Sequence, residues 1–277
     1  MNNRIGLGII TCDRLDYLKQ CVTAIAANNT DLDYIVVVND GKPFDADTVD
    51  FLNSSGVDEI IQHSPSYKSV GVTKNQAIRS ILLNDCDHIF LIENDIIIKR
   101  SDVFKTYINA ANVSGIWHLN FALHGPANKK TGSEEKNPRQ VVDYDGTQIA
   151  LYPHCVGAFS YFYKGIIKNV GFFDERFKNA FEHVEHTYRI IKKDLHPPFW
   201  WFADISNSEE YLTEIPGSIK NSSIPHTKEW TSNYQRANGW FEIKHGSEPT
   251  QIPDTKQEDV FEKLQFIEQN YAKKITI

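Results

Sequence analysis

The sequence predicts an α/β protein with a mainly parallel central sheet flanked by helices. In the first half of the chain, apolar runs of strand length alternate with stretches that carry apolar residues at helical spacing. The strand-like runs are continuous rather than alternating, which is typical of strands buried on both faces. Strands separated by helices in this way form a parallel sheet with right-handed crossovers.

Each element has its own signal. Strands are expected at 4–10, 34–38, 57–61 and 88–92, because these runs are apolar and mostly β-branched. Helices are expected after the first strand, where Leu15, Leu18, Val22 and Ile25 share one face, and at 46–52 and 71–83. Further along, a helix is expected at 102–111, strands at 115–121 and 155–163, and helices at 180–193 and 258–271.

The rest of the chain is less regular. Residues 124–145 are rich in Gly, Lys, Asn, Glu and Pro and predict an exposed loop or hairpin. This segment either shapes a binding site or is a solvated insertion without a role. No linker divides the chain, so we expect one domain over 1–230 and a helical C-terminal extension over 231–277 that packs on it.

Composition restricts the class of protein. The 277 residues are 41% hydrophobic and 23% charged, enough for a large core, and contain no apolar run of about 18 residues or more that could span a membrane. With 36 acidic and 29 basic residues and a net charge of −7, large nucleic acids are not expected as partners. The N-terminus lacks signal-peptide regions, which predicts a cytoplasmic protein. Four separated cysteines, without a CxxC pair, predict neither a structural zinc site nor a disulfide framework.

Two carboxylates stand at the end of the fourth predicted strand. Glu93-Asn94-Asp95 follows the apolar run 89–92 directly. Open α/β sheets bind ligands beyond the carboxyl ends of their strands, and acids there can hold a cation. Taken alone, these residues favour an acidic turn that caps the next segment over a cation site.

Several separated motifs occur in a fixed order. They are Ile-Ile-Thr-Cys-Asp-Arg at 9–14, Val-Val-Val-Asn-Asp-Gly at 36–41, Gly-Val-Thr-Lys-Asn-Gln-Ala at 71–77, Glu-Asn-Asp at 93–95, Gly-Phe-Phe-Asp-Glu-Arg-Phe at 171–177 and Glu-His-Val-Glu at 182–185. Together they resemble the family-2-like glycosyltransferases of the GT-A fold, over roughly residues 5–226. The resemblance implies a single GT-A domain and a hexosyltransferase-like enzyme.

The resemblance also implies a nucleotide site. By position in the motifs, Thr11, Arg14 and Asp40 would bind the base and ribose. Lys74 and Asn75 match the place where the family commonly has Arg-Asn, and they would approach the nucleotide or its diphosphate.

A metal site is implied by the same comparison. Glu93-Asn94-Asp95 resembles the Asp-X-Asp motif of the family, in which Mn²⁺ or Mg²⁺ neutralises the leaving diphosphate. Asp95 would be the direct ligand, whereas Glu93 and Asn94 would contact the nucleotide sugar or a metal-bound water. Ile224-Pro225-His226 resembles the late histidine element, which makes His226 a second candidate ligand.

The reacting groups are expected at residues 182 and 183. Where inverting members have an Asp that removes the acceptor proton, this chain has His183, and imidazole can act as a general base near neutral pH. Glu182 would bind sugar hydroxyls or serve as the alternative base. A zinc hydrolase is a poorer interpretation, because neither HExxH nor HxxEH is present.

The aromatic residues near positions 200 and 230 have two possible roles. Phe199, Trp200 and Trp201 either form a platform for an acceptor or pack in the core. Trp230 either covers the nucleotide or anchors its loop.

The expected function is metal-dependent transfer of a sugar, with inversion, from a nucleotide diphosphate donor, UDP-sugar in the first instance, to a hydroxyl of a glycan, protein or small molecule. A nucleotidyltransferase is the enzyme alternative, although the first loop lacks a glycine-rich, basic phosphate loop. A non-catalytic glycan- or nucleotide-binding module of the same fold is the other alternative.

Overall fold

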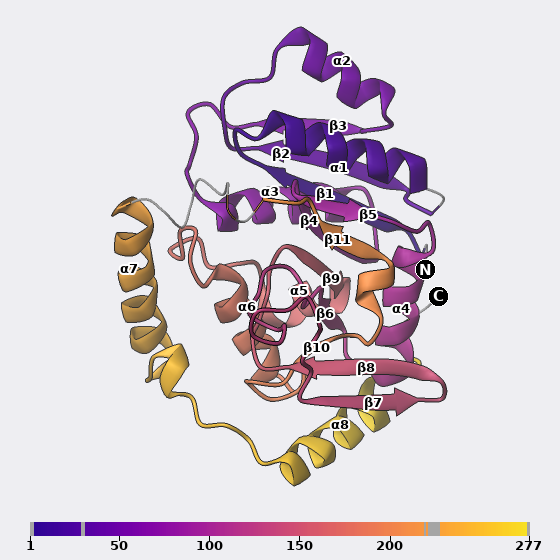
Figure 1. The fold of residues 1–277 in the computed structure, drawn as a ribbon, viewed down its shortest axis with the longest axis vertical. Helices are drawn as coiled ribbons and strands as arrows, with labels where there is room; N and C mark the ends of the chain where they lie inside the picture. The colour runs from indigo at the N-terminus through magenta and orange to yellow at the C-terminus, as the bar shows by residue number, and fades with distance from the viewer. Residues whose placement is uncertain (1–2, 29–30, 219, 221–227, 276–277) are drawn as a thin grey trace.

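A six-stranded sheet lies at the centre of the molecule, with strand order β3-β2-β1-β4-β9-β6 (Figure 1). The strands span Ile5–Thr11 (β1), Tyr34–Asn39 (β2), Glu59–Gln62 (β3), His88–Glu93 (β4), His118–Asn120 (β6) and Phe159–Tyr163 (β9). Strands β1 to β4 run parallel, and β9 is antiparallel to β4 and β6. The predicted mainly parallel sheet is thus confirmed. This computed structural model describes residues 3–28, 31–218, 220 and 228–275.

Helices flank this sheet and extend beyond it. They span Leu15–Asn28 (α1), Ala46–Ser54 (α2), Val70–Leu83 (α3), Val103–Ser114 (α4), Lys164–Val170 (α5), Glu182–Ile191 (α6), Lys228–His245 (α7) and Gln257–Tyr271 (α8). Two short 3-10 turns lie at Ser208–Glu210 (η1) and Pro249–Gln251 (η2). The helices predicted at 46–52, 71–83, 102–111, 180–193 and 258–271 are present, with ends displaced by up to three residues.

Two small sheets complete the fold. Gln140–Tyr144 (β7), Thr147–Tyr152 (β8) and Phe202–Ile205 (β10) form an antiparallel sheet, and Ile96–Ile98 (β5) pairs with Leu212–Glu214 (β11). Residues 124–145 are predicted to form a loop or a hairpin. The end of this segment is part of a hairpin, because β7 is followed directly by its antiparallel partner β8. The strands predicted at 115–121 and 155–163 are shorter than expected, at 118–120 and 159–163.

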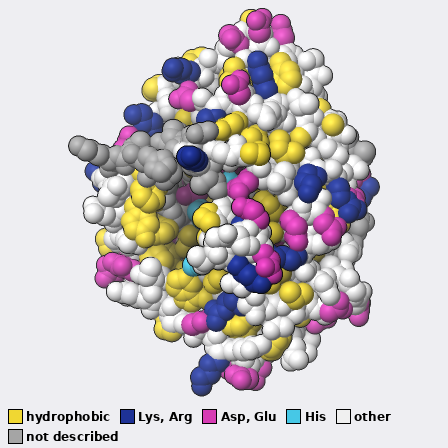
Figure 2. Space-filling view, viewed as in Figure 1, with side chains coloured by type: hydrophobic (Ala, Val, Ile, Leu, Met, Phe, Trp, Pro, Cys, Tyr) yellow, Lys and Arg dark blue, Asp and Glu magenta, His cyan; other side chains and the backbone are white. Residues whose placement is uncertain are grey.

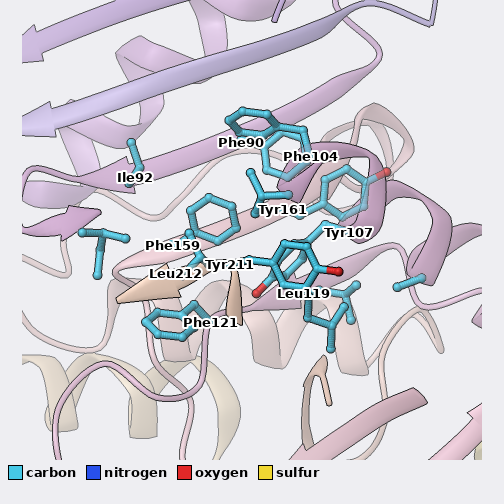
Figure 3. Packing of buried hydrophobic residues seen from close by; sticks show 14 of the residues in the cluster. Phe90, Ile92, Phe104, Tyr107, Leu119, Phe121, Phe159, Tyr161, Tyr211 and Leu212 are labelled. Atoms are coloured by element: carbon cyan, nitrogen blue, oxygen red, sulfur yellow. The ribbon is translucent and has the colours of Figure 1, made fainter. Parts of the chain in front are cut away.

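The core lies on both faces of the central sheet, because successive strand side chains point in opposite directions. In β1, Leu7 and Ile9 join the larger cluster, whereas Ile10 joins the cluster under α3. Figure 3 shows the aromatic part of the larger cluster, where the Phe90 ring lies 4.9 Å from the Tyr161 ring. Because side chains on both faces of the sheet are buried, the central strands appear in the sequence as continuous apolar runs.

Helix α3 packs unusually close to β1. A Cβ atom on Gly8 would lie 2.6 Å from the Cβ atom of Ala77, so only glycine permits this approach. The Ser69 side chain caps α3 by accepting from the Val72 amide at 3.5 Å. The start of α3 is thereby held beside the carboxyl ends of β1 and β4.

The C-terminal helices cover different parts of the domain. Helix α8 contacts α4, and α7 packs on the α6 region through a buried cluster. Figure 1 shows α7 along one edge and α8 at the opposite end of the long connecting segment. The expected boundary after residue 230 falls inside α7. Within the described ranges, the structure has no helix with the length and apolarity that a membrane span requires.

Candidate functional site

Two adjoining pockets lie beyond the carboxyl ends of β1, β2 and β4. The first has a volume of about 430 Å³ and includes Thr11, Arg14, Asp40, Lys42 and Lys68 in its lining. The second, of about 570 Å³, is lined by residues that include His154, Phe181, His183, Trp200 and Tyr234. Among the residues that the structure describes, four line both pockets: Val70, Glu93, Asn179 and Trp230.

Figure 2 shows the surface around these pockets. Hydrophobic side chains gather on one side of this face, below the grey segment, and histidine atoms show in the hollow beside them. The lining of the second pocket is correspondingly rich in aromatic and aliphatic side chains. Pockets of this size, mostly apolar with a few convergent polar groups, are typical of small-molecule sites.

Asn94 ties the first loop to the acidic motif. Its amide nitrogen donates to Thr11 Oγ1 at 2.8 Å, and its amide oxygen accepts from Arg14 Nη2 at 2.9 Å. Arg14 also forms an ion pair with Asp95, Nη2 to Oδ2 at 3.1 Å. The structure therefore brings four predicted site residues into one hydrogen-bonded group, with Thr11, Arg14 and Asn94 in the lining of the first pocket.

Asp40 shapes the rim of the first pocket. Its carboxylate accepts from the backbone amides of Tyr67 at 2.7 Å and Ser69 at 3.0 Å, and it contacts His63 Nδ1 at 3.0 Å. These contacts fix the segment that carries Lys68 into the pocket lining. Asp40 lies in the lining, but most of its acceptor capacity is used within the protein.

Lys74 lies beneath the meeting point of the two pockets. Its ammonium group is 3.3 Å from Glu93 Oε1, 3.2 Å from Glu182 Oε1 and 3.1 Å from the Gly157 carbonyl oxygen. Burial by itself lowers the pKa of Lys74, but the two carboxylates outweigh burial and raise it. The lysine therefore stays protonated and links the acidic motif to the start of α6.

Asn75 faces away from both pockets. Its side-chain nitrogen donates to the Phe173 carbonyl at 3.0 Å and to Glu175 Oε1 at 2.9 Å, and its side-chain oxygen accepts from the Phe173 amide at 2.9 Å. These bonds satisfy the amide group and fix the turn before α6. In this structure Asn75 positions a loop and does not reach the pocket lining.

Glu182 and His183 form a pair in the second pocket. Glu182 Oε1 lies 3.1 Å from His183 Nδ1. Burial raises the pKa of Glu182, but Lys74 and His183 lower it by a larger amount. The pKa of Glu182 is therefore below its usual value. Gly157 allows the imidazole its position, since a Cβ there would lie 2.7 Å from His183 Cγ. The pair is an ionised carboxylate that can orient an imidazole.

Asp95 Oδ1 makes no hydrogen bond to any residue that the structure describes. Asp95 is 3% exposed, and His124 Nε2 likewise has no hydrogen-bond partner among the described residues. These two atoms face each other at 3.6 Å, which is too long for a hydrogen bond. Burial alone would raise the pKa of Asp95, but His124 and Arg14 lower it.

The Asp95 and His124 atoms fit a divalent cation, which carboxylate and imidazole both ligate. The described residues contain no group of three or more metal-ligating side chains. Further ligands would therefore have to come from a substrate, from water or from elsewhere in the chain. His226, the other predicted ligand, lies outside the described residues.

The sequence alone does not indicate His124 or part of the aromatic lining as site residues. His124 follows β6 by four residues, in the segment interpreted as a loop, and only its placement next to Asp95 reveals it. Phe181 and Tyr234 also escaped notice, because no periodicity links the residue before α6 with one on α7. Trp200 and Trp230, by contrast, were identified and do lie in pocket linings.

Comparisons with solved structures identify the fold. S. aureus TarS residues 1–349 in complex with UDP superposes with a TM-score of 0.55 and 11% identity, covering 92% of this chain and 76% of that one. The UDP-GlcNAc complex of the same TarS fragment gives a TM-score of 0.54 and 10% identity, covering 95% and 80%. Drosophila β1,4-galactosyltransferase 7 is a looser match, with a TM-score of 0.48 and 13% identity over 83% and 79%.

The molecule has the GT-A fold of nucleotide-sugar glycosyltransferases. At 10–11% identity, the likeness to TarS concerns the fold alone. No protein-family model matches the chain, and no curated protein sequence matches it.

Proposed function

We propose that this protein is a glycosyltransferase that moves a sugar from a nucleoside diphosphate to an acceptor hydroxyl. The observation that carries the proposal is the pair of adjoining pockets that share Glu93, with the Glu182–His183 pair in the second. Two substrates bound side by side at that junction can exchange a group directly. The GT-A fold is compatible with this chemistry.

The first pocket is assigned to the donor nucleotide. Arg14, Lys42 and Lys68 supply positive charge for a diphosphate, and Thr11 and Asn94 supply polar contacts. Asp40 supports this site by holding the segment that carries Lys68. A UDP-sugar is the proposed donor, in keeping with the uridine nucleotides bound to TarS.

His183 is the proposed general base. With its Nδ1 proton donated to Glu182, the other ring nitrogen keeps a lone pair that can accept a proton. The acceptor oxygen would form a bond to the anomeric carbon and lose its proton to His183. The bond from that carbon to the diphosphate would break with its electron pair, so the configuration at the carbon would invert. Glu182 is assigned to orient the imidazole, because its pKa is too low for a base.

A divalent cation, Mn²⁺ or Mg²⁺, is proposed at Asp95 and His124. The unsatisfied Asp95 Oδ1 and His124 Nε2 support this assignment, and His226 stays a predicted further ligand. When bound, such an ion neutralises charge on a leaving diphosphate. Arg14 would keep Asp95 oriented through its other oxygen.

Titration of UDP into the protein, with and without Mn²⁺, tests donor and metal binding together. The wild-type affinity for UDP is expected to rise at least tenfold with Mn²⁺. Asp95→Asn should abolish that increase, since it removes a charged ligand. Asp50→Asn, on the exposed face of α2, is the matched control and should behave like wild type. Equal UDP affinity with and without metal in all three proteins would contradict the metal assignment.

Catalysis is tested separately by the release of UDP and free sugar from a panel of nucleotide sugars. Turnover by the wild type and a loss of about 10²-fold or more in His183→Ala are expected. Tight UDP binding without turnover of any donor, with or without acceptors, would favour the binding-module alternative instead.

A further inference from the structure

The second pocket is lined by two groups of packed aromatic rings. In one group, the Phe181 ring lies 4.8 Å from Tyr234, which lies 5.5 Å from Trp230. In the other, the Phe199 ring lies 4.9 Å from Trp200. These residues come from the start of α6, from α7 and from the segment before β10, so three distant parts of the chain converge on one pocket.

Two of these aromatic residues have left-handed backbone conformations. Phe181 has φ 60° and Trp200 has φ 71°, and they are the only aromatic residues with positive φ in the described part of the chain. Bulky side chains rarely adopt this conformation, which glycine or asparagine accepts more easily. Both side chains are half-buried, so each leaves surface open to the pocket. Strained backbone conformations cluster at ligand-binding sites, which suggests that the Phe181 and Trp200 rings contact a ligand in this pocket.

Surrounding contacts hold these two backbones in place. The Phe181 carbonyl accepts from the Glu185 amide at 2.8 Å, which starts α6. The Trp200 carbonyl accepts from Arg139 Nη1 at 3.2 Å, and the Trp200 indole donates to the Ile252 carbonyl at 2.8 Å. The two backbones and the Trp200 ring are therefore held in place before any ligand arrives.

The charges around the second pocket differ from those around the first. No Lys or Arg belongs to the described lining of the second pocket, whereas Glu93 and Glu182 do. Lys74 lies behind them, 1% exposed, and its donors already reach both carboxylates and a carbonyl. Burial lowers the pKa of His154, which keeps that imidazole neutral at pH 7. An anionic group between the aromatic rings would lie near Glu93 and Glu182, whereas the described positive charge at this pocket, His124 and the cation proposed beside it, belongs to the Asp95 end.

We propose that the acceptor is an uncharged carbohydrate, whose apolar ring face stacks on Phe181 and Trp200 while one hydroxyl reaches His183. This proposal rests on the proposed function and names its acceptor class. Aromatic faces offer rigid apolar surface, and the carboxylate of Glu93 can accept hydrogen bonds from sugar hydroxyls. Phosphorylated sugars, uronates and diphosphate-linked acceptors are disfavoured by the same arrangement.

Donor turnover in the presence of matched acceptors tests this assignment. Glucose, cellobiose and their neutral aryl glycosides are compared with glucose 6-phosphate and glucuronate, for the full chain with the nucleotide sugar that it hydrolyses. At least one neutral sugar should stimulate release of the nucleotide saturably, and the anionic counterparts should stimulate it at least tenfold less. Equal or better stimulation by the anionic compounds would overturn the proposal.

Two variants test the aromatic residues. Phe181→Asn and Trp200→Asn suit the left-handed backbone, so their melting temperatures should stay within a few degrees of wild type while the KM for the neutral acceptor rises at least tenfold. Trp240→Asn, an exposed tryptophan on α7 outside both linings, should leave that KM unchanged. An unchanged KM in both pocket variants would overturn the proposed stacking role.

A gain-of-function variant tests the electrostatic argument without removing a packed aromatic ring. Thr250 is exposed and lines the second pocket, so Thr250→Lys adds a lysine to a described lining that contains neither Lys nor Arg. Stimulation by glucose 6-phosphate should rise several-fold relative to glucose, and an unchanged ratio would count against the electrostatic argument. If the wild type neither binds UDP nor hydrolyses any donor, the proposed function fails, and that result is distinct from these outcomes.

Discussion

At the scale of single residues, Lys74 has the most constrained environment in the site. It is 1% exposed, and its ammonium group contacts two carboxylates from segments 89 residues apart, at positions 93 and 182. Lysine is almost never fully buried without such partners. Without it, Glu93 and Glu182 would face each other with no cation between them.

Lys74→Met should therefore lower the free energy of unfolding by about 3–5 kcal/mol, because the buried Glu182 and the half-buried Glu93 lose the cation that pairs with both of them. The double variant with Glu182→Gln should recover part of that loss. Urea unfolding measures both, and Lys130→Met, at an exposed ion pair with Glu135, serves as a control expected to cost under about 1 kcal/mol. A loss as small as the control's would show that Lys74 is not needed to balance the acids.

The positions of Lys74 and Asn75 show what sequence can and cannot predict here. The motif at 71–77 was correctly assigned to a helix, and both residues were expected near the nucleotide. Consecutive helical residues point about 100° apart, so Lys74 reaches Glu93 whereas Asn75 reaches the Phe173 backbone. Which of the two faces the site depends on how α3 packs, and no local pattern contains that information.

At the scale of elements, α6 and α7 are joined by one buried carboxylate. Glu185, fully buried, lies 3.0 Å from Arg189 Nε, 2.8 Å from Lys244 Nζ and 3.1 Å from His245 Nε2. The last turn of α7 is thereby held to the first turn of α6. The other end of α7 carries Trp230 into both pocket linings, so this contact helps to position the pocket wall.

Glu185→Gln should loosen α7 more than the rest of the molecule. Amide hydrogen exchange of 234–245 should speed up, while α8 stays unchanged as the internal reference, and the free energy of unfolding should fall by about 1–3 kcal/mol. Glu258→Gln, at the exposed start of α8, is the matched control. Exchange in α7 that is identical in both variants would contradict this role of Glu185.

Helix α7 also marks a limit of prediction. Its sequence is polar overall, and its few buried positions, such as Ala237 and Phe241, face a small cluster. A helix that buries so little gives a weak periodic signal. Strands β5 and β11 escaped for a different reason, because three residues cannot show an alternation. Strands β1, β2 and β4 were predictable since each forms a run of six or seven mostly buried residues, whereas β3 has four residues and is half-buried to exposed.

At the scale of the whole molecule, Asp204 connects three parts of the structure. From β10, its carboxylate accepts from Tyr107 Oη on α4 at 2.7 Å and from the Ala122 amide at 2.9 Å. The second contact fixes the segment that leads to His124. Burial raises the pKa of Asp204 to about 7, although its hydrogen bonds oppose the shift.

This raised pKa predicts how stability depends on pH. Between about pH 4 and pH 7, the folded carboxyl group keeps a proton that the unfolded chain has lost, so the folded state binds more protons and stability falls as pH rises. The contribution is fully present below about pH 4 and lost above about pH 7. The difference in unfolding free energy between wild type and Asp204→Asn should shrink by roughly 3 kcal/mol across this range.

Urea unfolding at a series of pH values measures this difference. Asp145→Asn, in an exposed turn whose backbone is already left-handed, is the control and should track the wild type. A constant difference between wild type and Asp204→Asn from pH 4 to pH 7.5 would mean that Asp204 is already ionised in the folded protein.

The shared wall of the two pockets has a thermodynamic consequence. Because Val70, Glu93, Asn179 and Trp230 line both, an occupant of either pocket touches part of the boundary of the other. Any factor by which the first ligand changes the affinity of the second must then act equally in reverse. These four side chains are therefore where substitutions would alter cooperativity between the two ligands.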